Sequence, residues 1–304
     1  MTFDAQVIAA YGRHLTVRDE SGREREARPF GRKLSVVCGD HVRCEHDATH
    51  DEIHVVDVLP RRSVLQRTSL RGLAEPVVAN ITQLLAVLAP KPRPDPFIID
   101  RYLCAASSAG LLARIVWNKA DLTTSDDDPP IEFEHAGYPV LHCSTVTGVG
   151  LDALRAVLAG QISVFVGQSG VGKSSLISFL LPQAPLVTGE LDRNDEGRHT
   201  TTAARLYDLP GGGVLIDSPG VRDFAPAIES LEPRSLGFPE VDRLAPGCRF
   251  LDCAHLREPA CAVRTEAERE TPSTLSARRY ESYRRLRRLY EDLRAARGPG
   301  PRGH

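Results

Sequence analysis

The stretch "VFVGQSGVGKSSL", residues 164–176, decides the fold of this 304-residue chain. A short apolar run leads into a glycine-rich turn, and the turn leads into a segment typical of the start of a helix. The pattern GxxxxGK[ST] is complete, with Gly167, Gly172, Lys173 and Ser174 at its fixed positions. The stretch therefore predicts a strand, a phosphate-binding loop (P-loop) and a helix in an α/β domain.

A loop of this kind would hold the phosphates of a nucleotide. Lys173 would reach the β- and γ-phosphates, and Ser174 would ligate Mg²⁺. The other loop residues that we expect at the nucleotide are Gln168, Ser169, Gly170, Val171 and Ser175. A glycine-rich turn without a ligand is the alternative, and the complete pattern in its strand–turn–helix setting disfavours it.

The segment "WNKAD", which ends at Asp121, indicates which base is bound. Asp121 can accept hydrogen bonds from N1–H and the exocyclic amine of guanine, whereas adenine offers no such pair of donors. A buried carboxylate left unpaired costs about 1–3 kcal/mol or more, so guanine is favoured. Asn118 and Lys119 belong to the same motif, and the stem of Lys119 can lie over the base. Ser144 and Thr145, in "CSTVTGVG", are expected near the guanine.

The segment "LIDSPGV" would sense the γ-phosphate and Mg²⁺. Asp217 would hold Mg²⁺ through water, and the N–H of Gly220 would face the γ-phosphate. Thr201 is expected to supply the second hydroxyl on Mg²⁺, although Thr200 is hard to separate from it. In Ras-type switches a glutamine after this motif orients the attacking water, but Val221 stands here. We therefore expect slow intrinsic hydrolysis.

Another residue must then orient the attacking water, and the loop just before the threonine run offers a candidate. His199 is our candidate for orienting water, with Lys173 and Thr201 as the other catalytic residues; an exposed loop histidine is the alternative.

The guanine motif precedes the P-loop, so the order of parts is a circular permutation of the Ras-like order. Such a permutation is tolerated because domain termini often lie close together.

Three domains are expected. Residues 1–66 contain five short β-rich segments separated by turn signals, which suits a small oligonucleotide-binding (OB) type barrel, with an SH3-like barrel as the alternative. Residues 67–237 form the permuted Ras-like α/β GTPase domain. Residues 238–304 form an α-helical zinc-binding domain with an arginine-rich helical tail.

The zinc prediction rests on the pattern C-x4-C-x-H-x5-C, formed by Cys248, Cys253, His255 and Cys261. Three thiolates and one imidazole complete a tetrahedral Zn²⁺ site with no open position, which indicates a structural role. A redox pair or unrelated buried cysteines are the alternatives.

The tail helix is rich in arginine and tyrosine. Tyr280 and Tyr283 could stack on bases. A solvated helix packed on its own zinc domain is the alternative. The side chains that could contact RNA phosphates are Arg278, Arg279, Arg284, Arg285, Arg287 and Arg288.

Composition narrows the class of protein. A net charge of −2 disfavours a sequence-blind polyanion binder, which would be strongly basic. There is no apolar run of about 20 residues and no secretion signal at the N-terminus. Seven cysteines in such a chain argue against a disulfide framework. We expect a cytoplasmic monomer that binds neither membrane nor DNA.

With these motifs in view, the chain resembles the RsgA family of small-ribosomal-subunit-dependent GTPases over almost its whole length. The matching stretches are "PRRSVLQR", "ANITQLLAVLAP", "DRYLCAA", "NKADL", "GQSGVGKSSL", "GRHTTTAARLYDLPGGGVLIDSPGVRDF" and "CRFLDCAHLREPACAV". The family has a hydrophobic residue in place of the catalytic glutamine, as Val221 is here, and a histidine in its G-x-H-T-T-T segment, matched by His199. The family's zinc ligands match the cysteine and histidine positions given above.

The resemblance implies hydrolysis of GTP to GDP and phosphate, with Mg²⁺ and one structural Zn²⁺. It implies stimulation by the small ribosomal subunit, binding to its rRNA and a role in its late maturation. A GTP-stabilised RNA-binding protein with little turnover is the alternative function. A P-loop ATPase or small-molecule kinase is a third, which the guanine motif disfavours.

Overall fold

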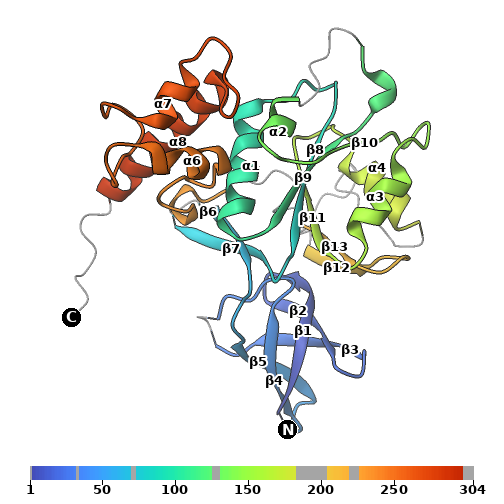
Figure 1. Cartoon of the computed structure of the whole chain (residues 1–304). Helices are drawn as coiled ribbons and strands as arrows, with labels where there is room; N and C mark the ends of the chain where they lie inside the picture. The colour runs from blue at the N-terminus through green and yellow to red at the C-terminus, as the bar shows by residue number, and fades with distance from the viewer. Residues whose placement is uncertain are drawn as a thin grey trace, which may run out of the picture.

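The computed structural model describes residues 2–31, 34–69, 73–124, 131–182, 204–218 and 226–296. Figure 1 shows a β-barrel at the N-terminal end, a central α/β body, and a helical C-terminal part beside that body. Among these residues, no helix combines the length and apolar character needed to span a membrane.

The N-terminal barrel has five strands: β1 (Thr2–Tyr11), β2 (His14–Asp19), β3 (Glu24–Pro29), β4 (His41–Asp47) and β5 (Glu52–Val58). The strand order is β1-β2-β3-β5-β4, and pairing of β4 with β1 closes the barrel. Strands β3 and β5 run parallel, and the other pairs run antiparallel. Alternate residues such as Leu15 and Val17 point into the core. The OB-type barrel is confirmed, and the SH3-like alternative is not.

A hairpin of β6 (Val64–Thr68) and β7 (Ala74–Ala79) joins the barrel to the α/β body and forms a two-stranded sheet of its own. The body contains β8 (Gln83–Leu88), β9 (Leu112–Trp117), β10 (Val140–His142), β11 (Ile162–Val166), β12 (Ala204–Asp208) and β13 (Val214–Asp217). Their order is β10-β9-β8-β11-β13-β12, and only the last strand is antiparallel to its neighbour. All six residues of the central strand β8 are buried, as expected when both faces of a parallel sheet are covered.

Helices cover the two faces of this sheet. Helix α1 (Pro96–Ser108) and the short α2 (Ile131–His135) share a core with alternate residues of β8 and β9, such as Leu84 and Ile115. Helices α3 (Leu151–Leu158) and α4 (Lys173–Leu180) pack with the intervening residues, such as Leu85 and Val116. A 3-10 turn, η1 (Ala120–Leu122), follows β9.

A 3-10 turn, η2 (Ile228–Ser230), leads to the C-terminal part, which consists of α6 (Pro239–Leu244), η3 (Ala245–Gly247), α7 (Ala262–Ala267) and α8 (Ala277–Ala296). Its apolar side chains continue the core on the α1 face of the sheet, from Leu103 on α1 to Phe238 and Tyr283. The helical part is therefore packed directly against the α/β body, as Figure 1 shows.

The tail helix α8 departs from one of our predictions. Tyr280 and Tyr283 are buried, and their hydroxyls donate to the carbonyls of His255 and Ala254 at 2.8 and 3.0 Å. Arg279 is only 1% exposed. The prediction that these tyrosines stack on bases and that Arg279 contacts phosphates is wrong, because the described helix packs this face on its own fold.

Candidate functional site

The P-loop occupies the turn between β11 and α4, as its sequence pattern requires. A Cβ on Gly167 would lie 2.3 Å from the carbonyl oxygen of Val87. Gly172 has a φ of 95°, and a Cβ there would lie 2.3 Å from Nδ2 of Asn118. Both glycines of the pattern are therefore needed, because a side chain at either position would collide with Val87 or Asn118. Lys173 begins the helix directly after Gly172.

Lys173 is held inside the loop. Its side chain is buried, and its Nζ donates to the carbonyl oxygens of Gly167 and Gln168, both at 2.7 Å. An ammonium group fixed at the N-terminus of a helix, beside a glycine-rich turn, suits the negative charge of nucleotide phosphates. Among the other loop positions, Ser169, Ser174 and Ser175 are exposed.

The guanine motif contacts the P-loop, although the two lie about fifty residues apart in the sequence. Nδ2 of Asn118 donates to the carbonyl of Val171 at 2.9 Å, and Nζ of Lys119 donates to the carbonyl of Gly170 at 2.6 Å. Oδ1 of Asn118 is buried and has no hydrogen-bond partner within the described ranges. These contacts place Asn118 and Lys119 at the loop that would hold the phosphates, so both motifs face one site.

The third residue of the guanine motif is oriented by the loop after β10. Oγ of Ser144 donates to Oδ1 of Asp121 at 2.5 Å and accepts from the N–H groups of Val146 and Thr147 at 3.2 and 3.1 Å. Asp121 itself is exposed on η1, and Thr145 follows Ser144 in the same loop. A carboxylate that is held on one side and open on the other fits a pair of base donors.

The Mg²⁺ residues that can be located lie at the carboxyl edge of the sheet. Asp217 is the last residue of β13, which runs parallel beside β11, and Ser174 is the second residue of α4. A carboxylate and a hydroxyl at this edge are the oxygen ligands that Mg²⁺ prefers. The other residues predicted for this part of the site lie outside the described residues: His199, Thr200, Thr201, Gly220 and Val221.

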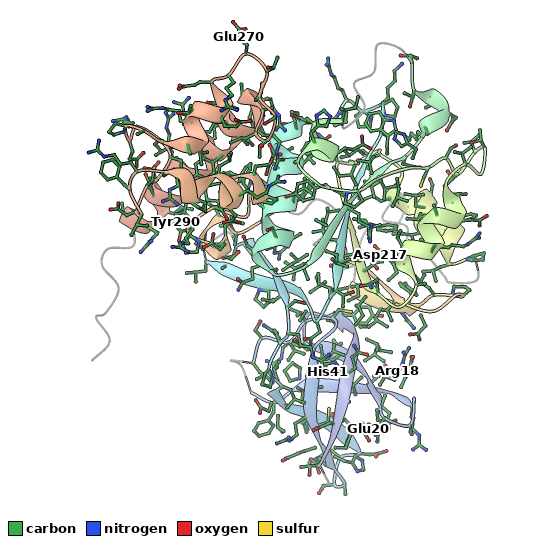
Figure 2. All side chains as sticks on the ribbon, in the orientation of Figure 1. Arg18, Glu20, His41, Asp217, Glu270 and Tyr290 are labelled. Atoms are coloured by element: carbon green, nitrogen blue, oxygen red, sulfur yellow. The ribbon has the colours of Figure 1, made fainter. Side chains whose placement is uncertain are left out.

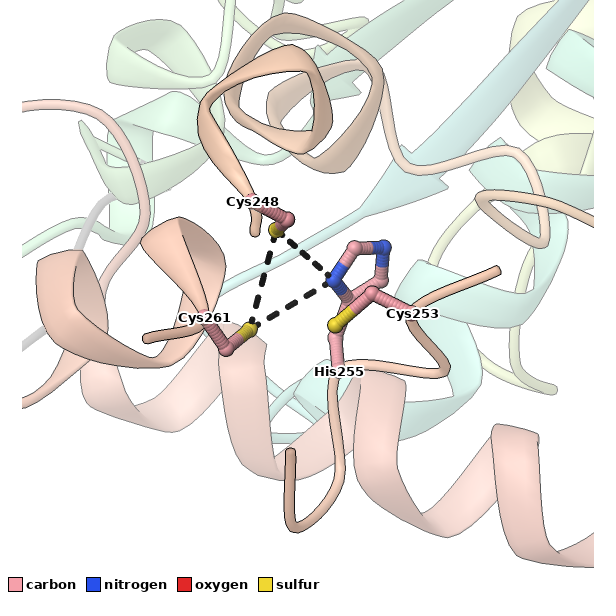
Figure 3. Close-up of side chains that lie close together, drawn as sticks. All are labelled: Cys248, Cys253, His255 and Cys261. Atoms are coloured by element: carbon pink, nitrogen blue, oxygen red, sulfur yellow. Dashed lines mark hydrogen bonds between the residues drawn. The ribbon is translucent and has the colours of Figure 1, made fainter. Parts of the chain in front are cut away.

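The predicted zinc ligands form a compact cluster, which we call the metal centre (Figure 3). Their ligand atoms all lie within 4.8 Å of one another. Nδ1 of His255 is 3.5 Å from Sγ of Cys248 and of Cys261, and these two sulfurs are 3.9 Å apart. A tetrahedral zinc with Zn–S of about 2.3 Å and Zn–N of about 2.0 Å requires roughly 3.5 Å between N and S and roughly 3.8 Å between the two sulfurs. The cluster, completed by Cys253, therefore fits Zn²⁺.

The loop around the metal centre is held by its own hydrogen bonds. The carboxylate of Glu258 accepts from the N–H groups of Ala254, Leu256 and Arg257 at 2.8–3.0 Å. Burial lowers the pKa of His255, which favours the neutral imidazole that a metal ligand must be. The buried tyrosines of α8 bind the same loop, which explains why they face inward.

Substitution of one ligand tests the metal centre. Cys261→Ser should lose the bound zinc, because three remaining ligands leave a tetrahedral site incomplete. Cys143→Ser is the matched control, since Cys143 is buried in the core on the α3 and α4 face of the sheet, away from the metal centre. The check is zinc content per purified chain, with one ion expected in the wild type and in Cys143→Ser. Equal zinc content in both variants would rule out this assignment.

Sequence reasoning missed a group that we call the buried ionic cluster: Asp100, Glu132, Glu240, Arg278 and Arg279. Arg279 binds both Glu240 and Asp100, and Arg278 binds both Asp100 and Glu132. The cluster thereby joins α8 to α1, α2 and α6. The available signal was Asp100 itself, a carboxylate that follows the apolar run "PFII" in the predicted helix "PFIIDRYLCAA".

The comparisons with known proteins agree with this geometry. A family model described as RsgA GTPase matches residues 58–226. The protein named small ribosomal subunit biogenesis GTPase RsgA from Pseudomonas aeruginosa is 41% identical over 288 residues, covering 92% of this chain and 84% of the relative. Its namesake from Chromohalobacter salexigens is 45% identical over 292 residues, with the same coverage.

Two solved structures share the fold. The crystal structure of YjeQ from Thermotoga maritima matches with a TM-score of 0.73 and 29% identity, covering 97% of this chain and all of that one. The structure of YloQ, described as a circularly permuted GTPase, matches with a TM-score of 0.68 and 24% identity, over 97% of this chain and 96% of that one.

Proposed function

Because the chain belongs to the RsgA GTPase family and is a GTPase of small ribosomal subunit biogenesis, we propose that it hydrolyses GTP at the site described above and is stimulated by the small subunit. The family implies GTP, GDP and Mg²⁺ as ligands, and the metal centre is compatible with zinc. The observation that carries the proposal is the meeting of Asn118 and Lys119 with the P-loop, which supports base and phosphate recognition in one place.

We propose the following roles in hydrolysis. Asp121, oriented by Ser144, selects guanine, and Lys173 neutralises charge on the β- and γ-phosphates. A bound Mg²⁺ would supply positive charge that stabilises the charge developing on the phosphate oxygens. Ser174 and Asp217 would hold that ion together with Thr201. Since Val221 cannot orient water, His199 or a group from the ribosome does so.

We also propose bounds for the three parts of the chain and an RNA-binding role for the first of them. The OB-type barrel is suited to rRNA, because barrels of this type bind oligonucleotides on their strands and loops. A boundary after residue 66 falls within β6, so we place the end of the barrel between Val58 and Val64. The α/β part extends to residue 237, and the helical part begins at Phe238, the N-cap of α6. We propose that the protein acts as a cytoplasmic monomer, with one structural zinc.

Steady-state GTP hydrolysis, with and without purified small ribosomal subunits, tests the proposal. We expect stimulation of at least roughly tenfold, since a completing group supplied by a partner has a large effect on phosphoryl transfer. Large subunits and ATP are the controls, and neither should produce turnover above the basal rate. Lys173→Ala should lose both basal and stimulated hydrolysis.

A slow rate that small subunits do not change would contradict the proposed stimulation. In that case nucleotide binding with little turnover, together with retained binding to RNA, would support the alternative of a GTP-stabilised RNA-binding protein.

A further inference from the structure

The barrel and the α/β sheet are hydrogen-bonded into one continuous sheet. Strand β1 of the barrel pairs antiparallel with β12, with Ala9 opposite Arg205 and Ala10 opposite Ala204. Strand β12 in turn pairs with β13, with Arg205 opposite Asp217. Ala9, Arg205 and Asp217 therefore form one row across three neighbouring strands. At a strand spacing of about 4.8 Å, the barrel strand lies only about 10 Å from the proposed Mg²⁺ residue.

Asp217 lies at the end of β13, where the pairing with β12 continues beyond the pairing with β11. The parallel register of β13 with β11 ends at Ile216, which lies opposite Val164. The pairing of β13 with β12 extends one residue further and places Arg205 opposite Asp217. The outer edge of β12 is held by the barrel strand, and Ala9 is fully buried at that junction.

One ion pair and one close approach of the backbone place the barrel against the same hairpin. Arg18 on β2 reaches across β1, and its Nη1 is 2.8 Å from Oδ2 of Asp208 on β12. Gly39, in the barrel loop before β4, has a φ of 92°, and a Cβ there would lie 3.4 Å from Cδ1 of Ile216. Figure 2 shows Arg18 on the barrel and Asp217 in the α/β body above it.

From this register we propose that barrel strand β1 positions the Mg²⁺ carboxylate Asp217 through β12, with Ala9, Ala10 and Arg18 as the positioning residues. The inference rests on the proposed function, because it concerns the same GTPase site. It implies that a partner held by the barrel acts on the Mg²⁺ side of that site by a direct strand-to-strand route.

Reversal of one charge tests the proposal. Asp208→Arg places a like charge against Arg18 and should loosen the β1–β12 edge. In hydrolysis measured without ribosomal particles, we expect the Mg²⁺ concentration for half-maximal rate to rise roughly three- to tenfold. GTP affinity measured in EDTA should not change. The double variant Arg18→Asp/Asp208→Arg restores the opposite charges and should restore the Mg²⁺ dependence.

The matched control is Glu52→Arg. It makes the same charge change opposite Arg28, 3.6 Å away, wholly within the barrel, and should leave the Mg²⁺ dependence as in the wild type. Hydrogen exchange gives a readout besides activity: the amides of residues 204–208 should exchange faster in Asp208→Arg than in Glu52→Arg.

The outcomes separate this inference from the proposed function. If Asp208→Arg matches Glu52→Arg in both readouts while the wild type depends normally on Mg²⁺, the positioning role is overturned and the GTPase proposal stands. If the wild type binds no guanine nucleotide, the proposed function is lost and this inference is lost with it.

Discussion

Arg279→Met should lower the free energy of unfolding by about 3–5 kcal/mol, because it removes the shared partner of two buried carboxylates. Nη2 of Arg279 lies 2.9 Å from Oε2 of Glu240, and its Nη1 lies 2.5 Å from Oδ1 of Asp100. Both carboxylates are fully buried. The guanidinium also lies 5.1 Å from the ring centre of Phe238, so methionine replaces the packing of the stem but not the charge.

The measurement is urea unfolding followed by the fluorescence of Trp117, the single tryptophan of the chain, which is buried in β9. Arg285→Met is the matched control on the same helix. Arg285 is 58% exposed and pairs with Glu281 at 3.1 Å, so its loss should cost no more than about 1 kcal/mol. Equal unfolding midpoints for the two variants would show that the buried ionic cluster does not hold α8 to the body.

The loss in free energy of unfolding caused by Arg279→Met should depend on pH. Burial raises the pKa of Asp100, while Arg279 and Arg278 oppose that rise. Loss of Arg279 raises this pKa further above its value in the unfolded chain. A group with a raised folded pKa stabilises the fold below its unfolded pKa, and this contribution is lost as pH rises through the folded pKa. The deficit should therefore be largest near neutral pH and shrink toward about pH 4.

The parts that were predictable from sequence are those in which local backbone geometry restricts residue type. Glycine is required at 167 and 172 because a side chain there would collide with Val87 and Asn118, respectively. The P-loop pattern therefore indicates the backbone geometry of the loop directly. The same holds at the start of α1, where Asp95 accepts from the N–H of Phe97 at 2.9 Å and Pro96 takes the first helical position. Local signals of this kind do not depend on distant residues.

The parts that were not predictable depend on partners far away in the chain. Arg279 is buried because it pairs with Asp100, which lies 179 residues earlier in the chain. No pattern within α8 indicates that partner. A tail rich in arginine and tyrosine suggests a surface for RNA, yet Tyr283 packs on the metal centre loop. The pairing of β1 with β12 likewise joins strands almost two hundred residues apart.

Asp121→Asn should weaken GTP binding by about 3 kcal/mol or more, roughly a hundredfold or more in Kd. In the proposed complex the carboxylate accepts from both N1–H and the exocyclic amine of guanine. An asparagine amide keeps one acceptor but presents an NH₂ group to the guanine amine, so two donors face each other. Xanthine carries a carbonyl oxygen in place of that amine, so the variant should bind xanthosine triphosphate more tightly than the wild type does.

Displacement of a fluorescent guanine nucleotide by GTP and by xanthosine triphosphate measures both changes. Asp152→Asn is the matched control, because Asp152 undergoes the same chemical change on the exposed first turn of α3, where it pairs with Arg155. Lys173→Ala should weaken both nucleotides equally, since it acts on phosphates that the two share. A reversed preference in Asp121→Asn alone therefore assigns base selection to Asp121, whereas parallel losses for both nucleotides would mean that Asp121 supports the loop without reading the base.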